Sequence, residues 1–347
     1  MIKENLFGKT KEELQAIALE LGLPKFNGSQ WAEWMYKNNA DSLEDMHNVS
    51  KKAKALIAEK YTIEKSKFSS VQESVDGTKK YLFHIRGEHF IEAAYIPDKD
   101  RATLCVSSQV GCKMGCLFCM TGKQGFQVNL STGEILNQIY SLPEFDKLTN
   151  VVYMGMGEPF DNLNHVLKSI EILTADYGMA WSSKRITVST IGIIPGMKTF
   201  LDKSKAHLAI SLHSPFEEER KKIMPIENVF RLPQLINEIK SFEFGRQRRV
   251  SFEYIMFKDF NDTKKHVDQI ARILNGINCR INLIRFHPIP GTPLLGSDEA
   301  TIIKFQNELK KKGIVTTLRA SRGEDIYAAC GLLSTKELIK RKEEEDF

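Results

Sequence analysis

The stretch ATLCVSSQVGCKMGCLFCMTG, Ala102 to Gly122, joins a short apolar run to three cysteines at C-x3-C-x2-C spacing. The run has the length and composition of a buried β-strand, and the glycines after it allow the backbone to wrap around a compact ligand. Cys112, Cys116 and Cys119 are half of the six cysteines in a chain of 347 residues. The segment therefore predicts a strand that ends in a thiol-bearing loop.

Five further apolar runs follow this loop, separated from one another by segments of helix length. They are NVVYMGMG, RITVSTIG, HLAISLHS, RVSFEYIMF and RINLIRFHP. Strands that alternate with helices indicate parallel βα units. Six such runs are too few for a complete eight-unit barrel, so we expect an α/β fold with a partial (βα)6 barrel. Its ligands should bind at the carboxyl ends of the strands.

Two smaller parts are expected before the barrel and one after it. Apolar residues at helical spacing predict a small helical accessory domain, which we place at residues 1–75. Alternating residues from Lys79 to Pro97 predict a β-hairpin connector at 76–97, and its second strand carries Glu92. The barrel core then spans 98–326 and a C-terminal segment with Cys330 spans 327–347, ending in the frayed tail KRKEEEDF.

Length, charge and cysteine content limit the class of protein. The start of the chain has no apolar stretch of signal-peptide length, and no uncharged run approaches the ~18 residues that span a bilayer. We therefore expect a cytoplasmic protein with no membrane partner, in which six cysteines indicate metal or redox chemistry. The net charge is +5, and clusters such as SKKAKALIAEK, GRQRR, LKKKG and KELIKRK fit either phosphate contacts or solvated helix faces.

The cysteine spacing favours an iron-sulfur cluster over zinc. A structural zinc site usually has two ligand pairs, and neither Cys105, Cys279 nor Cys330 forms a second C-x2-C. A 4Fe-4S cluster normally takes four cysteines, so three leave one iron open to another ligand. We expect the three loop cysteines to hold such a cluster.

This cysteine motif after the first strand of a partial barrel resembles the radical S-adenosylmethionine (SAM) superfamily. The resemblance implies that the open iron binds SAM and that an electron from the cluster cleaves it to a 5′-deoxyadenosyl radical. It also implies SAM contacts at the ends of later strands. The matching residues are Gly157 and Glu158 in GMGEP, Ser189 in STIG, Ser211, Leu212 and His213 in SLH, and His287 in FHPIPG, where the narrower family named next often has Asn. Without the resemblance, these segments are also compatible with ordinary turns and polar strand ends.

Longer strings resemble one family within that superfamily. YIPDKDRATLCVSSQVGC, STIGIIPG, ISLHSPFEEER and RGEDIYAACG are similar to the dual-specificity adenine-carbon-2 methyltransferases of 23S rRNA and tRNA. The likeness covers nearly the whole chain. It implies that 2-methyladenosine is made in the peptidyl-transferase centre and at the tRNA adenosine 3′ of the anticodon. It also implies consumption of two SAM per methylation and an electron donor such as flavodoxin, and we expect a monomer.

The family mechanism implies roles for three residues outside the cluster. One SAM methylates Cys330, and the radical formed from a second SAM takes hydrogen from that S-methyl group. The resulting methylene radical adds to the electron-poor carbon 2 of adenine. Cys105 then releases the base by forming a transient disulfide with Cys330, while Glu92 accepts the ring proton. On residue type alone, the two cysteines are also compatible with inert buried thiols and Glu92 with an exposed hairpin carboxylate. Cys279 matches no functional position, and we assign it to a buried strand face.

Two other functions stay open at this point. A sister family methylates carbon 8 of the same rRNA adenosine, confers antibiotic resistance and shares the cluster, both extra cysteines and the Glu. A non-catalytic iron-sulfur or zinc RNA-binding protein would cleave no SAM and would tolerate Cys330→Ala. Aromatic residues of the helical domain fit base stacking or, better, a helix core: Trp31, Trp34 and Tyr36.

Overall fold

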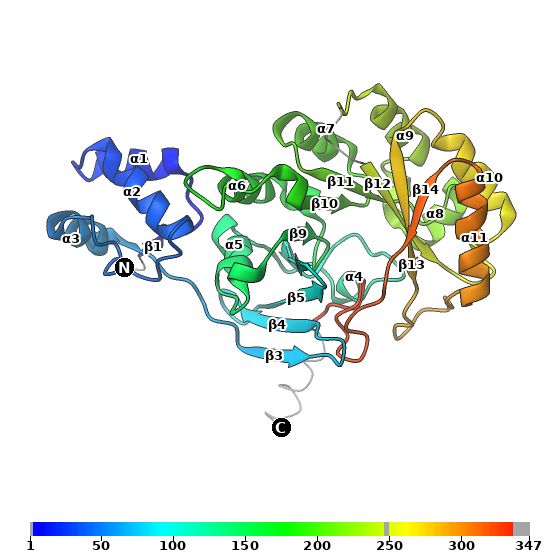
Figure 1. Cartoon of the computed structure of the whole chain (residues 1–347), viewed down its shortest axis with the longest axis horizontal. Helices are drawn as coiled ribbons and strands as arrows, with labels where there is room; N and C mark the ends of the chain where they lie inside the picture. The colour runs from blue at the N-terminus through cyan, green and yellow to red at the C-terminus, as the bar shows by residue number, and fades with distance from the viewer. Residues whose placement is uncertain (1–2, 246–249, 336–347) are drawn as a thin grey trace.

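The computed structural model describes residues 3–245 and 250–335. A ten-stranded sheet forms its centre, in the order β14-β13-β12-β11-β10-β9-β6-β5-β4-β3, and most helices cover the outer side of this sheet (Figure 1). The tail KRKEEEDF, KELIKRK and most of GRQRR lie outside the described residues.

The parallel part of the sheet confirms the predicted partial barrel. Among the described residues seven neighbouring strands run parallel: β6 (Arg101–Cys105), β9 (Asn150–Tyr153), β10 (Ile186–Thr190), β11 (His207–Ser211), β12 (Val250–Met256), β13 (Cys279–Arg285) and β14 (Val315–Leu318). The first six are the strands that the sequence predicts. The seventh, β14, has the sequence VTTL, and two central threonines give it no apolar run to recognise.

Helices connect consecutive parallel strands and bury one face against the sheet. They are α4 (Met120–Gln124), α5 (Thr132–Tyr140), α6 (Leu163–Thr174), α7 (Ile194–Lys203), α8 (Glu217–Ile223), α9 (Leu232–Ser241), α10 (Lys264–Ile273) and α11 (Glu299–Lys311). In α9, for example, Leu235, Ile236 and Ile239 are buried at helical spacing. Short 3-10 turns occur at Phe145–Lys147, Pro159–Asn162, Ser183–Arg185 and Pro225–Asn228. Within the described ranges, no helix is long and apolar enough to cross a membrane.

The amino-terminal part is helical, as the sequence predicts. It contains α1 (Lys11–Glu20), α2 (Lys25–Tyr36) and α3 (Lys51–Lys60), together with the short parallel pair β1 (Glu4–Asn5) and β2 (Tyr61–Thr62). Trp31 and Tyr36 are fully buried, and Trp34 is half-buried with its indole N–H donating to Asn48 Oδ1 at 2.5 Å. Trp31 and Tyr36 therefore belong to the core of this part and Trp34 packs at its margin, which agrees with the helix-core interpretation.

The predicted β-hairpin is present, but it is continuous with the barrel sheet. β4 (Lys79–His84) pairs with β5 (Phe90–Asp98), and β5 pairs antiparallel with β6, the first barrel strand. A further strand, β3 (Ser70–Glu73), pairs with β4 and lies at the edge of the sheet. The hairpin is therefore part of the barrel sheet, which it extends beyond β6, and is not a separate connector between two domains.

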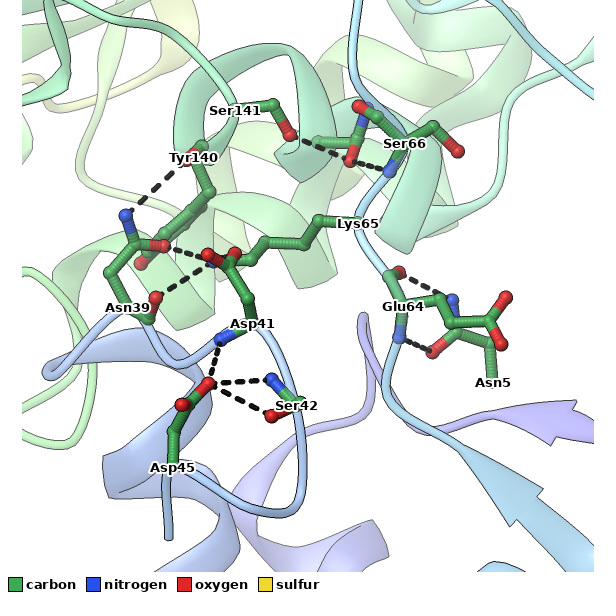
Figure 2. Close-up of polar contacts among 11 residues, drawn as sticks. Asn5, Asn39, Asp41, Ser42, Asp45, Glu64, Lys65, Ser66, Tyr140 and Ser141 are labelled. Carbon is green, nitrogen blue, oxygen red and sulfur yellow. Dashed lines mark hydrogen bonds and ion pairs between the residues drawn. The ribbon is translucent and has the colours of Figure 1, made fainter.

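A short linker joins the helical part to the sheet and is held on both sides (Figure 2). The ammonium of Lys65 donates to the carbonyl of Asn39 in the helical part at 2.9 Å. The backbone of Ser66 exchanges two hydrogen bonds with the side chain of Asn137 on α5, at 2.8 and 2.9 Å. These contacts fix residues 64–66 between the two parts.

Candidate active site

A cavity of about 240 Å³ lies at the carboxyl ends of the parallel strands. Most of the predicted site residues line it: Cys105, Cys112, Cys116, Cys119, Gly157, Glu158, Ser189, Ser211, His213 and Cys330. We call this space the cysteine cavity. The structure thus brings together residues that lie more than two hundred positions apart in the sequence.

Three predicted site residues lie elsewhere in the described structure. The side chain of Leu212 is fully buried in the main apolar core, and its N–H donates to the carbonyl of Glu253 at 3.0 Å. His287 contacts Ser321, a residue that lines the cysteine cavity, with 3.0 Å between its Nε2 and the hydroxyl oxygen. Glu92 lines a neighbouring cavity that is described below.

The loop that carries the three cysteines is shaped by tight backbone contacts. Gly111 has φ +70°, and a Cβ at this position would overlap the carbonyl of Gly125. The N–H of Cys119 donates to the carbonyl of Cys116 at 3.2 Å, and α4 begins directly after Cys119. Glycine at position 111 is therefore required to bring both arms of the loop together.

The loop thiols fit a cluster better than a single ion. Burial raises the pKa of Cys112 to about 12 and that of Cys116 well above its ordinary value, so a bound metal must displace protons from both. In the part of the chain that the structure describes, no three His, Cys, Asp or Glu side chains converge as the ligands of one ion would. A cubane cluster instead binds each cysteine at a different iron, which suits three separated thiols that line one cavity.

Glu158 is a buried carboxyl group at the end of β9. It accepts hydrogen bonds from the Thr190 hydroxyl at 2.6 Å, the Ile191 N–H at 3.0 Å and the Phe160 N–H at 3.1 Å. Burial raises its pKa to about 7, although these hydrogen bonds oppose the shift. The turn before it needs Gly157, because φ is +96° and a Cβ would lie 2.5 Å from Cβ of Gln109. The site therefore offers a carboxyl group that ionises near neutrality.

His213 is a buried, neutral side chain at the end of β11. Its Nδ1 accepts a hydrogen bond from the Ile255 N–H at 3.1 Å, and its ring packs edge-on against Phe118 of the cysteine loop, with 4.7 Å between centroids. Burial lowers the pKa of His213 to about 3, and Arg220 lowers it further. The ring is therefore uncharged, and it contacts both the cysteine loop, through Phe118, and β12, through the Ile255 N–H.

Cys105 and Cys330 line the same cavity from different directions. Cys105 is the last residue of β6 and is buried, whereas Cys330 is exposed to the cavity from the C-terminal segment. The pKa of Cys105 is raised to about 12, first by burial and then by Cys330, while Arg319 opposes this shift. Loss of water around its sulfur, inside the cavity, also raises the pKa of Cys330, and Arg319 again opposes the rise. Arg319 therefore favours the thiolate form of both cysteines.

Arg319 and Glu253 are cavity residues that the sequence interpretation missed. The Arg319 guanidinium lies 3.4 Å from Glu253 Oε2, and both side chains line the cysteine cavity. Arg319 directly follows β14, and because β14 has no apolar run, nothing in the sequence marks Arg319 as the end of a strand. Glu253 is the single charged residue in the largely apolar run SFEYIMF, and this signal is present in the sequence.

From here on, the C-terminal segment means the described residues that follow β14, 319–335. This segment is attached on both sides of Cys330. Upstream, Asp76 accepts from the Gly323 N–H at 3.0 Å, and Asp325 accepts from the Ser74 hydroxyl at 2.5 Å. Downstream, the Thr121 hydroxyl of α4 donates to the carbonyl of Leu333 at 2.7 Å. Figure 1 shows this segment in red, running from β14 back to β4 and α4. These contacts place Cys330 beside the loop that carries the three cysteines.

Glu92 lines a second cavity of about 530 Å³ between the antiparallel strands and the C-terminal segment. We call it the strand cavity; its lining includes Ser70, Gln72, Lys80, Leu82, Glu92, Tyr327 and Ser334. Glu92 is 4% exposed and lies 3.1 Å from the ammonium of Lys80, so it is no exposed hairpin carboxylate. Cys279, by contrast, is the first residue of β13 and packs half-buried against the main core.

Comparison with known proteins agrees with this geometry. Residues 106–274 match the model of the radical SAM superfamily, and residues 4–63 match that of the ribosomal RNA large subunit methyltransferase N-terminal domain. A crystal structure of a radical SAM methyltransferase from Sphaerobacter thermophilus superposes with a TM-score of 0.89 at 34% identity. The match covers 95% of this chain and 99% of that one.

Curated relatives are similar over nearly their full length. A protein of Phocaeicola vulgatus called "Probable dual-specificity RNA methyltransferase RlmN" is 52% identical over 98% of this chain and 97% of its own. A protein of Parabacteroides distasonis with the same name is 55% identical over 96% of this chain and 97% of its own. Superfamily membership implies a 4Fe-4S cluster and SAM as cofactors. The chain therefore belongs to the RlmN family of dual-specificity RNA methyltransferases, within the radical SAM superfamily.

Proposed function

We propose that this protein methylates carbon 2 of adenosine in 23S rRNA and in tRNA, next to the anticodon, through a methyl group carried on Cys330. One observation carries the proposal: Cys105 and Cys330 line the same cavity as the three loop cysteines. A radical SAM protein that only cleaves SAM has no need of two further thiols there. Their presence supports a mechanism with a protein-bound methyl group.

Cys112, Cys116 and Cys119 are the residues that would hold the cluster. When bound, the cluster supplies the electron that cleaves SAM homolytically. The chain's own contribution is to exclude water from the site and to orient SAM. We assign the SAM contacts to residues at the strand ends that line the cavity: Gly157, Glu158, Ser189, Ser211 and His213. His287 would act through Ser321, and Leu212 would contribute only its backbone.

Cys330 is the methyl carrier in this proposal. Its thiolate takes a methyl group from the sulfonium of one SAM by displacement, so two SAM are consumed per methylated base. Hydrogen removal from the S-methyl group then gives a carbon radical on the Cys330 side chain. This radical adds to carbon 2 of adenine, which is electron-poor because it lies between two ring nitrogens. The protein and the RNA are then covalently joined.

Cys105 releases the methylated base. Its thiolate attacks the sulfur of Cys330, a disulfide forms, and the bond between that sulfur and the methylene carbon breaks. The carbon keeps the electron pair and takes a proton, which gives the methyl group. Counted from the two thiolates, the proton that the ring loses balances the proton that the methyl carbon takes up. The unpaired electron left on the ring must also depart, and it balances the electron that SAM cleavage consumes. A dithiol reductant must then reopen the disulfide.

Glu92 is the proposed acceptor of the ring proton. Its carboxylate lines the strand cavity, and the Ser334 N–H, four residues after Cys330, donates to Oε2 at 3.0 Å. This contact supports a role close to the methyl carrier. We also propose a flavodoxin-type electron donor, a monomeric enzyme and a helical RNA-binding domain ahead of the hairpin.

Anaerobic incubation of the reconstituted protein with labelled SAM and unmodified RNA fragments tests the proposal. We expect label in 2-methyladenosine, identified by mass spectrometry of the digested RNA. Label in 8-methyladenosine would assign the chain to carbon-8 chemistry instead. Intact SAM and unlabelled RNA would contradict catalysis and would favour a binding protein.

A further inference from the structure

The strand cavity contains a lysine to which the proposed chemistry gives no role. Nζ of Lys80 lies 3.1 Å from Oε1 of Glu92, and the two side chains are 12% and 6% exposed. A buried ion pair contributes little net stability, because taking both charges out of water costs about as much as their attraction returns. The pair therefore suggests a functional role for Lys80.

Strand register places this pair on the reactive face of the sheet. Lys80 lies opposite Ala94, and Leu82 lies opposite Glu92. Ala94 also lies opposite Cys105 on the next strand. Because partners in register share a face and side chains alternate along a strand, Lys80, Glu92 and Cys105 lie on one side of the sheet.

The neighbouring residue Lys79 provides an internal comparison. It points to the opposite face, where its ammonium lies 3.0 Å from Oε1 of Glu144, a carboxylate with 9% exposure. The strand β4 thus holds two lysines, each paired with a buried glutamate, and only one of them faces the strand cavity.

The carboxylate of Glu92 is contacted from two sides. Lys80 on β4 faces one oxygen, and the N–H of Ser334 donates to the other at 3.0 Å. The cavity beside it, about 530 Å³, is within the range of small-molecule sites, ~300–1,000 Å³. Both contacts restrict the orientation of the carboxylate relative to this space.

We propose that Lys80 is a positioning residue for proton transfer: its ammonium keeps the carboxylate of Glu92 ionised and directed at the RNA base. This inference rests on the proposed role of Glu92. In the step, the bond between carbon 2 and its hydrogen breaks, the proton moves to a carboxylate oxygen of Glu92, and the bonding electron pair stays in the ring. Without a nearby cation, burial favours the protonated carboxyl group, which accepts no proton.

The groups around Glu92 determine how the reaction should respond to pH. Among the described residues, those that line the strand cavity with Glu92 and carry polar side chains are Ser70 and Gln72 on β3, Lys80 on β4, and Tyr327 and Ser334 of the C-terminal segment, while Cys105 on β6 lies on the same face of the sheet. Of these, Lys80 carries the positive charge. Replacing Lys80 by a neutral residue should therefore raise the pKa of Glu92. Alkaline conditions, which ionise the carboxyl group again, should then restore the reaction.

Single-turnover reactions of the holoenzyme, methylated on Cys330, test this role. The RNA fragment carries deuterium at carbon 2 of its target adenosine, and product and protein–RNA adduct are measured at neutral and alkaline pH. For Lys80→Met we expect product formation about 10- to 100-fold slower at neutral pH, adduct accumulation, a larger isotope effect and recovery as pH rises. Lys80→Arg should retain the wild-type pattern, and Lys79→Met, the matched control, should do so too.

The outcomes separate this inference from the proposed function. If Lys80→Met shows the rate, pH response and isotope effect of Lys79→Met, the inference is wrong. If Glu92→Gln forms product at the wild-type rate, the proposed role of Glu92 is wrong, whatever Lys80 does. If Lys80→Met also loses SAM cleavage, its defect is structural. The rate, pH response and isotope effect of Lys80→Gln then decide whether Lys80 assists proton transfer.

Discussion

At the scale of single residues, surroundings distinguish side chains of the same type. Cys105 and Cys330 line a cavity with Arg319, whereas Cys279 packs at the amino end of β13 against the core. Burial alone raises the pKa of Cys279 to about 11, and among the described residues no cation opposes this rise. At Cys105, burial and Cys330 raise the pKa to about 12 although Arg319 opposes the rise. The guanidinium therefore stabilises the Cys105 thiolate, the nucleophilic form, relative to the same buried thiol without a cation beside it.

The first prediction concerns the release of the base. Cys105→Ala should stall after the RNA has been joined to Cys330, because no thiolate remains to attack the sulfur. We expect a covalent protein–RNA adduct on a denaturing gel and methylated product reduced at least about 100-fold. Cys279→Ala is the matched control and should release product normally. Recovery of free RNA and free protein from a methylation-competent Cys105→Ala reaction would contradict the release role.

The second prediction concerns pH and SAM binding. The folded-state pKa of Glu158 is raised to about 7 by burial, so the group is neutral below this pH and becomes a carboxylate as pH rises through it. An anion here attracts the ammonium of SAM, so SAM affinity should increase from mildly acidic to mildly alkaline pH. Glu158→Gln should bind SAM about 10- to 100-fold more weakly at alkaline pH and show a flat profile. Equal pH profiles for wild type and variant by calorimetry would exclude this contact.

At the scale of secondary-structure elements, the cysteine loop and the C-terminal segment form one unit. The Met120 N–H donates to the carbonyl of Gly331 at 2.8 Å, so the loop that would hold the cluster touches the residue next to Cys330. This contact places the methyl carrier near the cluster site without any contribution from a regular strand or helix.

The third prediction concerns the attachment of this segment. Burial opposes ionisation of Asp76, but hydrogen bonds from Thr78 and Gly323 outweigh it and lower the pKa to about 2. The stabilisation is therefore complete above the ordinary pKa of 3.8 and is lost as pH falls toward about 2. Asp76→Asn should cost about 1 kcal/mol locally and speed amide exchange in residues 323–335, with slower methylation. Unchanged exchange by mass spectrometry would show that Asp76 does not hold the segment.

The elements also show what the sequence can predict. Six strands and the cysteine loop were predictable, because apolar runs at βα spacing and the C-x3-C-x2-C motif are local signals. β14 and β3 were not, since VTTL and SVQE have mixed polarity and are stabilised by pairing with a neighbour. Arg319 and the Lys80–Glu92 pair were missed for the same reason, because contacts distant in sequence bring them into the cavities. Pairing of β4 with β5 brings Lys80 to Glu92, and pairing of β14 with β13 brings Arg319 to the strand ends.

At the scale of the whole molecule, the helical part and the barrel meet at a close backbone contact. A Cβ on Gly133, in the first turn of α5, would overlap the carbonyl of Phe7. Lys168 on α6 also lies 2.6 Å from Glu13 on α1. The approach of the two parts therefore depends on the absence of a side chain at position 133.

The fourth prediction follows from that contact. Gly133→Ala should displace the helical part and lower RNA affinity about tenfold, while SAM cleavage without RNA continues. Glu12→Ala, an exposed change on the same helical part, serves as the control. If Gly133→Ala binds RNA as the control does, the junction has no role in RNA binding.

The most direct test of the account is electron paramagnetic resonance of the reduced, reconstituted protein with SAM labelled at its amino nitrogen and carboxylate oxygen. Three cysteines that leave one iron open predict a 4Fe-4S signal that changes on SAM addition, with magnetic coupling to both labels. Cys112→Ala, Cys116→Ala or Cys119→Ala should abolish it. A zinc-filled site, or an iron signal that SAM leaves unchanged, would contradict the account.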